Sequence, residues 1–285
     1  MLKNRIVTTL VGLPVLIIAV WFDRPIHWFT LFISLCGIIA AGEFYRMVAR
    51  ARVSPYTYFG ILWTLLFIIS ADNAISGIIS PYLDPVKAPL FLLVLAIIIH
   101  LIWGLRRGEK KDSTDRWAWT MAGVLYVGVL LSLLVSLRGM DNGRNWVLFT
   151  LLASFASDTT AFFIGRKWGR HKLAPAISPG KTREGAIAGI LGAVIISLLF
   201  VPEQFGSLAN PLYLSPLKYY SAVLLGLAVS VFGQVGDLVE SMIKRNMNAK
   251  DSGWLLPGHG GILDRMDSVA FAGIVVYYFV LWVIQ

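Results

Sequence analysis

Long apolar stretches recur along the whole chain and alternate with short polar segments. One helical crossing of a bilayer needs about 20 mostly apolar residues. On this basis the pattern predicts about nine spans, at residues 6–22, 27–47, 56–76, 88–105, 117–137, 145–165, 184–202, 219–239 and 267–284. Asp72 and Asn73 interrupt the third stretch. The predicted fold class is therefore all-α, a polytopic transmembrane helical bundle.

The basic residues are distributed unevenly between the loops on the two sides of this predicted bundle. With nine spans, 20 of the 25 lysines and arginines fall on one side and 5 on the other. Cytoplasmic loops of membrane proteins carry an excess of Lys and Arg. The pattern therefore predicts a cytoplasmic N-terminus, with the loops that follow the even-numbered spans on the same side.

The composition agrees with a membrane protein. Apolar residues make up 57% of the chain and charged residues 14%, with a mean hydropathy of +0.71. Soluble proteins carry about 25% charged residues. We attribute the net charge of +9 to cytoplasmic loops and anionic lipid headgroups, and expect no nucleic-acid partner. The single cysteine, Cys36, excludes an intramolecular disulfide and a thiolate metal site.

Polar residues separate the chain into two halves. Residues 1–140 are predicted to contain N-terminal transmembrane helices with little chemistry. Their exception is Glu43, for which a structural pairing with Arg46, three positions along the helix, is favoured. Residues 141–285 are predicted to form a catalytic transmembrane region, with cytoplasmic loops at 166–183 and 240–266.

The strongest polar cluster continues from the eighth span. On a helix, Asp237, Glu240, Ser241 and Lys244 share one face, because they are three or four positions apart. That face carries acids at its membrane end and a cation at its cytoplasmic end. Acids inside a membrane are costly and are usually functional or paired.

Two further acids, Asp264 and Asp267, lie at the start of the last span. Together with Asp237 they offer three carboxylates from two helices, which suits a hard divalent cation such as Mg²⁺. We therefore assign these three residues as candidate metal ligands. The alternative for each single acid is a salt bridge within an interfacial loop.

Cations and glycines accompany these acids. Four cations, Lys244, Arg245, Lys250 and Arg265, could bind phosphate oxygens. Three loop glycines at 258, 260 and 261 would let a phosphate approach the backbone, beside a helix N-terminus. His259 between them is more typical of a hydrogen-bonding element than of an acid–base catalyst. Carboxylates, cations and a glycine turn together predict phosphoryl or nucleotidyl transfer.

A second polar cluster follows the sixth span. It contains Asp158 and a basic loop with Gly180-Lys181-Thr182. A P-loop is excluded, because Pro175 occupies the position of its first glycine and a membrane helix precedes it. The loop could hold a polyphosphate or anionic lipid headgroups. Gly185 and Gly189 indicate close helix packing rather than a site.

These residues resemble the phosphatidate cytidylyltransferase (CDP-diacylglycerol synthase) family of the bacterial type. Twelve signature positions over 27 residues are filled, by Ser241, Lys244, Arg245, Lys250, Asp251, Pro257, His259, Gly260, Gly261, Asp264, Arg265 and Asp267. Upstream matches are Asp158-Thr159, Gly165-Arg166, Gly169 and Ser178-Pro179. Gly180 departs from the family, in which a lysine is commoner. The resemblance covers roughly residues 154–268.

The resemblance implies a membrane-bound nucleotidyltransferase of phospholipid synthesis. CTP and phosphatidate would yield CDP-diacylglycerol and pyrophosphate, with Mg²⁺ as cofactor and room for a monovalent cation such as K⁺. It further implies the cytoplasmic side of the bacterial inner membrane and a homodimer. The implied catalytic residues are Asp237, Lys244, Asp264 and Asp267. The implied substrate-binding residues are Asp158, Ser178, Lys181, Arg183, Ser241, Arg245, Lys250, His259, Gly260, Gly261 and Arg265.

Three other functions remain as alternatives. An ion-coupled transporter could use intramembrane acids as a relay, but its acids would lie near the midplane rather than at cytoplasmic helix ends. An enzyme that exchanges the alcohol of a CDP-lipid would carry an Asp-Gly…Ala-Arg…Asp motif, which this sequence lacks. A structural membrane scaffold would not need its acids for any reaction.

Overall fold

The computed structural model of the chain describes residues 12, 14–22, 27–80, 87–106, 112–201, 212–214, 217–254 and 260–284. Their contacts divide the chain into two compact units. Unit 1 contains residues 1–139 and 246–264, and unit 2 contains residues 140–245 and 265–285. The boundary between residues 139 and 140 lies next to the one expected at residue 140. The segment 246–264, however, is grouped with the N-terminal helices.

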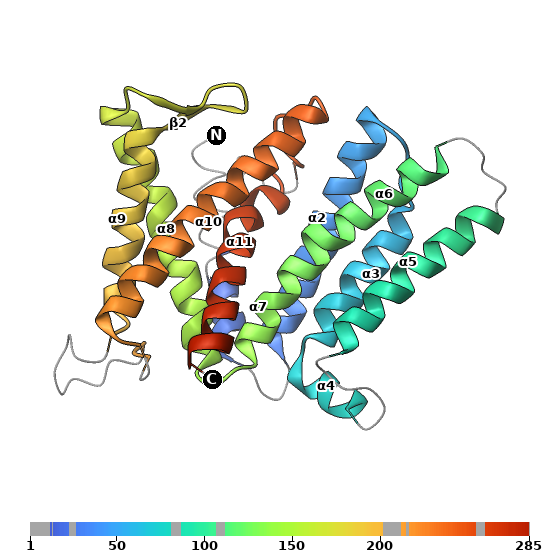
Figure 1. Ribbon diagram of the computed structural model, residues 1–285, viewed down its shortest axis with the longest axis horizontal. Coiled ribbons are helices and arrows are strands. Elements are labelled where there is room, and N and C mark those ends of the chain that lie inside the picture. Colours follow the sequence, from blue (N-terminus) through green and yellow to red (C-terminus); the bar gives the residue numbers. More distant parts are fainter. Residues whose placement is uncertain are drawn as a thin grey trace. The chain divides into compact units, whose positions relative to one another are not determined.

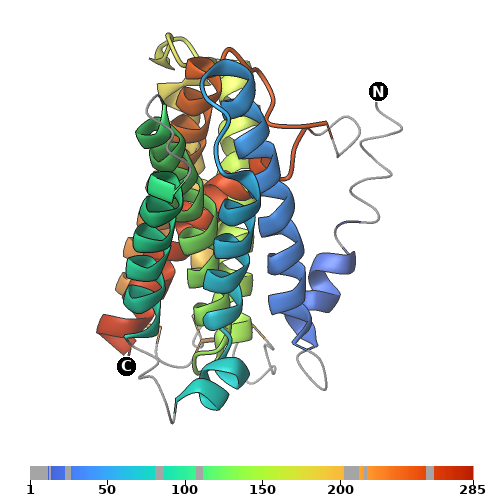
Figure 2. The ribbon, with the colours of Figure 1, turned by 90° about the vertical axis from the view of Figure 1, so that its right-hand side faces the viewer.

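Unit 1 is built from helices that follow the predicted spans. Its elements are α2 (Trp28–Ala51), α3 (Thr57–Ser70), α4 (Asn73–Ile79), α5 (Ala88–Arg106), α6 (Ser113–Gly123), η1 (Val124–Val129) and α7 (Leu130–Arg138). The last three form one continuous helix with a π-helical middle section. Figure 2 shows α2 and α3 as neighbouring blue ribbons, and they pack against each other along their lengths. The first predicted span is described only in part.

The interruption of the third predicted span has a definite structural role. Asp72 lies at the N-cap of α4, where its Oδ1 accepts a hydrogen bond of 2.9 Å from the backbone N–H of Ala74. Its Oδ2 contacts His27 and Thr30, at the beginning of α2. An acid at a helix N-cap satisfies an otherwise unpaired backbone donor. Asp72 therefore ends the third helix and starts the fourth.

The interior of unit 1 depends on close helix approach. Its core includes Trp63, Phe67 and Met121. The Tyr45 hydroxyl, on α2, donates a hydrogen bond of 2.8 Å to the Thr120 carbonyl oxygen, on α6. A Cβ atom at Gly123 would lie 2.4 Å from the Tyr45 ring. Close packing of this kind stabilises the fold, because each fully buried apolar side chain contributes about 1.5–3 kcal/mol.

Unit 2 carries the predicted acids Asp158, Asp237 and Asp267. Its elements are α8 (Gly143–Trp168), β1 (Lys172–Ala174), β2 (Ser178–Thr182), α9 (Arg183–Leu198), α10 (Tyr219–Asn246), α11 (Leu263–Phe279) and η3 (Val280–Ile284). Helices α8 and α9 lie side by side, joined at one end by the two strands (Figure 1). The first residues of α11 and the last of α10 are grouped with unit 1.

Glycine allows α8 and α9 to approach closely, as the sequence predicted. A Cβ at Gly185 would lie 2.7 Å from the Ala161 carbonyl oxygen, and one at Gly189 would lie 3.1 Å from that of Ser157. Both carbonyls belong to α8. This packing interpretation of the two glycines is therefore confirmed.

The basic loop after α8 differs from the all-helical expectation. Strands β1 and β2 pair in antiparallel fashion, with Lys172 opposite Thr182 and Ala174 opposite Ser178. Pro175 and Pro179 prevent a helix here, and pairing satisfies the backbone groups that a loop would leave to water. Thr182 then caps α9, accepting a hydrogen bond of 3.2 Å from the Gly185 N–H.

The helices fit a membrane protein. Among the described residues, six helical segments are long and apolar enough to cross a bilayer, and Thr57–Ser70 is a shorter apolar helix. Along α9, Ile187, Leu191 and Ile195 form an exposed apolar stripe, each about 60% accessible. Lipid would cover such a stripe without the cost that water imposes.

Candidate active site

The functional face of α10 is helical, as the sequence predicted. The helix continues to Asn246, beyond the expected end of the span at 239. Asp237, Glu240 and Lys244 therefore lie on one side of a single rigid element. The Ser241 hydroxyl donates a hydrogen bond of 3.5 Å to Oδ1 of Asp237.

Three carboxylates meet in unit 2. Oxygen atoms of Asp237, Glu240 and Asp267 all lie within 4.8 Å of one another. Glu240 is 1% exposed and Asp267 is 8% exposed. Oδ1 of Asp267 also accepts a hydrogen bond of 2.7 Å from the Ser268 N–H. We call these three residues the acid cluster. Hard carboxylate oxygens at this spacing fit a divalent cation such as Mg²⁺.

A glycine explains how acids from α10 and α11 come together. A Cβ at Gly236 would lie 2.7 Å from the Asp267 carbonyl oxygen and 2.9 Å from the Phe271 ring. Any larger residue at 236 would separate the two helices. The approach of the helices at Gly236 therefore brings Asp237 next to Asp267.

Polar contacts hold α10 against α8 and α9. Ser157 on α8 and Ser230 on α10 share a hydrogen bond of 2.7 Å between their buried hydroxyls. Gln234 donates from Nε2 to the Ala186 carbonyl oxygen at 3.1 Å and to Oγ of Ser230 at 2.9 Å. Buried polar groups that are fully hydrogen-bonded fix one arrangement of their helices. These contacts therefore set the position of the α10 acids.

Two lysines face the acid cluster. Nζ of Lys181, on strand β2, lies 2.6 Å from Oδ2 of Asp237. Lys244 forms a salt bridge with Glu240, four positions earlier on α10. The lysines are 23% and 12% exposed. The structure thus brings the two polar clusters of the sequence together at Lys181 and Asp237.

Asp158 belongs to the same surroundings. It is an exposed residue of α8 and interacts electrostatically with Asp237, Lys181 and Arg265. Asp267 interacts in the same way with Asp237 and Asp158. Acids from α8, α10 and α11 therefore share one electrostatic environment with two cations, Lys181 of strand β2 and Arg265 of α11.

The remaining predicted residues of unit 2 lie on or beside the hairpin. Ser178 begins strand β2 and is half-buried, whereas Arg183 begins α9 and is exposed. The Arg183 N–H donates a hydrogen bond of 2.9 Å to the His171 carbonyl oxygen. Arg245, at the end of α10, donates from Nε to the Ile177 carbonyl oxygen at 3.3 Å. Arg245 therefore ties α10 to the hairpin.

In unit 1, Asp264 holds a turn. Its carboxylate accepts hydrogen bonds from the backbone N–H groups of Ser252, at 3.1 and 3.2 Å, and Gly261, at 2.7 Å. Gly260 has a φ of +85°, which favours glycine. Asp264 and these partners all belong to unit 1. His259, a predicted site residue, lies outside the described residues.

The expected pairing of Glu43 with Arg46 is wrong. The two side chains form no salt bridge in the described part of the chain. Instead, Oε2 of Glu43 accepts hydrogen bonds from Oγ of Ser252, at 3.2 Å, and from the Leu263 N–H, at 3.0 Å. Glu43 is buried and Arg46 is exposed. The Glu43 carboxylate therefore contacts residues of a segment distant in sequence, and not the side chain on the next turn of α2.

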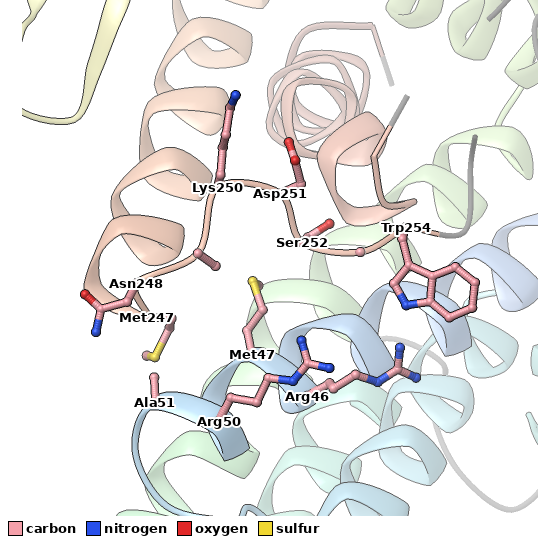
Figure 3. A pocket seen from close by; sticks show the side chains of 12 residues that line it. Arg46, Met47, Arg50, Ala51, Met247, Asn248, Lys250, Asp251, Ser252 and Trp254 are labelled. Carbon is pink, nitrogen blue, oxygen red and sulfur yellow. The ribbon is translucent and has the colours of Figure 1, made fainter. Parts of the chain in front are cut away.

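A pocket opens beside this turn within unit 1. Arg46, Met47 and Arg50 of α2 line one side, and the segment from Met247 to Trp254 lines the other. Figure 3 shows Met47 pointing from α2 toward Ser252, whereas Lys250 points away from α2. The predicted phosphate ligand Lys250 is exposed.

Sequence reasoning missed two features of these sites. Glu240 was placed on the α10 face but was not assigned to the metal, although its burial and its spacing from Asp237 join it to the acid cluster. Glu43 was assigned to a local ion pair, and no sequence pattern could reveal a partner more than 200 positions away.

Comparison with known proteins identifies the family. A family model described as the cytidylyltransferase family matches residues 3–283. The phosphatidate cytidylyltransferase of Bacillus subtilis (strain 168) is 31% identical over 281 residues, covering 97% of each chain. That of Staphylococcus haemolyticus (strain JCSC1435) is 33% identical over 244 residues, covering 85% of each.

A third relative is the uncharacterized protein YnbB of Escherichia coli (strain K12), which is 38% identical over 263 residues. This alignment covers 89% of the present chain and 80% of YnbB. The family model extends over nearly all of the sequence, including both units and the acid cluster. The chain therefore belongs to the cytidylyltransferase family.

Proposed function

We propose that this protein transfers a cytidylyl group from CTP to phosphatidate, producing CDP-diacylglycerol and pyrophosphate. The observation that carries this proposal is the acid cluster of Asp237, Glu240 and Asp267, faced by Lys181 and Lys244. Carboxylates for a metal beside cations for phosphates are what nucleotidyl transfer requires. The phosphatidate cytidylyltransferases among the relatives support the choice of substrates.

The proposed reaction is an in-line displacement. An oxygen of the phosphatidate phosphate attacks the α-phosphorus of CTP, and the bond from that phosphorus to the bridging β-phosphate oxygen breaks. Pyrophosphate leaves with the bonding electron pair. Because the attacking oxygen is already anionic, no strong general base is needed. The protein contributes by positioning the two phosphates and by neutralising their charge.

The described residues fit a divalent metal. Asp237 and Asp267 are assigned as metal ligands both by the resemblance and by their place in the acid cluster. The resemblance adds Asp264 as a third ligand, whereas unit 2 offers Glu240. Bound Mg²⁺ would supply positive charge to polarise the phosphates. A monovalent cation such as K⁺ is proposed as a second ion.

The other residues are proposed to bind substrate. Lys244 neutralises charge on the reacting phosphates, and Asp158 and Ser241 orient the groups around Asp237. The proposed phosphate-binding residues come from the two predicted cytoplasmic loops, 166–183 and 240–266. They are Ser178, Lys181, Arg183, Arg245, Lys250 and Arg265. Backbone N–H groups are proposed to bind the nucleotide phosphates at His259, Gly260 and Gly261.

We place the reaction at the cytoplasmic face of the bacterial inner membrane, where CTP is available. The excess of basic residues in one set of loops supports this side. The proposed topology has about nine spans and a cytoplasmic N-terminus. A homodimer is the proposed assembly, with phosphatidate and membrane lipid as its other partners.

Pyrophosphate release tests the reaction class. Purified protein in detergent micelles is given CTP and phosphatidate, with Mg²⁺ or with an excess of chelator. We expect release that requires both substrates and stops when the metal is removed. Protein that releases no pyrophosphate, yet moves ions in proteoliposomes, would favour the ion-coupled transporter, which no comparison supports. Formation of phosphatidylglycerol phosphate from CDP-diacylglycerol would favour alcohol exchange.

A further inference from the structure

We infer that Glu43 is a positioning residue for the reaction, although it belongs to α2 and lies outside the sequence motif. This inference rests on the proposed function, because it concerns the motif segment 252–264. Glu43 is 4% exposed, near the end of a helix that crosses the membrane. A buried carboxylate is costly unless its partners compensate.

The partners of Glu43 are the two ends of one motif segment. Ser252 donates to Oε2 from its side chain at 3.2 Å, and Leu263 donates to the same oxygen from its backbone at 3.0 Å. One carboxylate oxygen thus joins positions that are 11 residues apart in sequence. Hydrogen bonds to a charged acceptor are stronger than neutral ones.

The segment fits closely around this carboxylate. A Cβ at Gly253 would lie 2.1 Å from Oε1 of Glu43, and one at Gly261 would lie 2.4 Å from Oε2. Both distances are too short for any real side chain. Glycine at positions 253 and 261 therefore leaves the space that the Glu43 carboxylate occupies.

Asp264 also accepts hydrogen bonds near both ends of this segment. It accepts from the backbone N–H groups of Ser252 and Gly261. Two carboxylates, one from α2 and one from α11, therefore fix the ends of the segment that contains His259. Asp264 belongs to the family motif, and Glu43 supplies the matching constraint from the N-terminal half of the chain.

This role predicts a specific ranking of substitutions. Glu43→Gln retains one side-chain oxygen that can accept both hydrogen bonds. Glu43→Ala removes the acceptor and leaves two buried donors unsatisfied. A small misplacement of groups around a reaction can lower kcat about 100-fold. We expect about this loss for Glu43→Ala, and most of the activity to remain in Glu43→Gln.

Hydrogen–deuterium exchange of the full-length protein in micelles separates positioning from general destabilisation. Glu43→Ala should raise exchange in peptides from 246–264 and leave α3 and α5 unchanged, while kcat falls. Asp72→Asn is the matched control, because Asp72 is also a buried acid of unit 1, 4% exposed, whose carboxylate accepts a backbone hydrogen bond, at the N-cap of α4. It should change neither the exchange of 246–264 nor kcat.

Three outcomes overturn the inference. The first is unchanged exchange of 246–264 in Glu43→Ala, and the second is an equal rise in Asp72→Asn. The third is full kcat in Glu43→Ala despite faster exchange of that segment. Wild-type protein that releases no pyrophosphate would instead overturn the proposed function. The two failures are therefore distinguishable.

Discussion

Buried and partly buried acids have different partners in the two units. In unit 2, Asp237, Glu240 and Asp267 converge from two helices and face lysine side chains. In unit 1, Asp264 and Glu43 direct their carboxylates at backbone N–H groups and a serine hydroxyl. The partners of an acid therefore indicate whether it is placed to bind a cation or to hold a turn.

The largest effect is expected for the acid cluster. Asp267→Asn should lower kcat about 1000-fold, because an amide is a weaker ligand than a carboxylate for the Mg²⁺ that would neutralise phosphate charge. Asp237→Asn should lower kcat by a similar factor. The measurement is the rate of pyrophosphate release at saturating CTP. Asp141→Asn, an exposed acid of unit 2, is the control and should retain wild-type activity.

Asp264→Asn tests whether the turn acid also serves the metal. We expect it to lose nearly all turnover while the protein still inserts into the membrane. If Asp264 is a ligand, the Mg²⁺ concentration for half-maximal rate should rise in the residual activity. An unchanged Mg²⁺ dependence, combined with faster exchange of 246–264, would assign Asp264 to the turn alone and leave Glu240 as the third ligand.

Lys181→Gln tests the link between the hairpin and the acid cluster. Loss of this cation should raise the KM for CTP about tenfold, since one charge-assisted phosphate contact contributes about 1.5 kcal/mol. Lys172→Gln, on the neighbouring strand β1, is the matched control. Equal effects of the two substitutions would mean that general positive charge matters, and not the position of Lys181.

Ser252→Ala should have the smallest effect. It removes the hydroxyl link to Glu43 but leaves the backbone contact with Asp264. A single hydrogen bond contributes about 1 kcal/mol, so kcat should fall by roughly fivefold. A loss as large as that of Glu43→Ala would show that Ser252 acts on substrate directly and not through Glu43.

The sequence predicted the helices well because membrane spans have a strong pattern. Apolar stretches located α2, α5, α8 and the long helix from Ser113 to Arg138 within a few residues. Helical periodicity also predicted the shared face of Asp237 and Lys244, since both lie on one continuous helix.

What the sequence could not predict depends on contacts between distant segments. The β-hairpin at 172–182 is short and has no alternating apolar pattern, so its pairing was not visible. The proximity of Lys181 to Asp237 and the partners of Glu43 arise only when the helices pack. Local patterns specify elements, whereas these sites are made between elements.

The fate of the CTP phosphates tests the central proposal most directly. Purified protein is incubated with phosphatidate, Mg²⁺ and CTP labelled at either the α- or the γ-phosphorus. We predict that the α-label moves into the lipid fraction as CDP-diacylglycerol and the γ-label is recovered in pyrophosphate. A γ-label that enters lipid, or an α-label that stays in water-soluble products, would contradict the account.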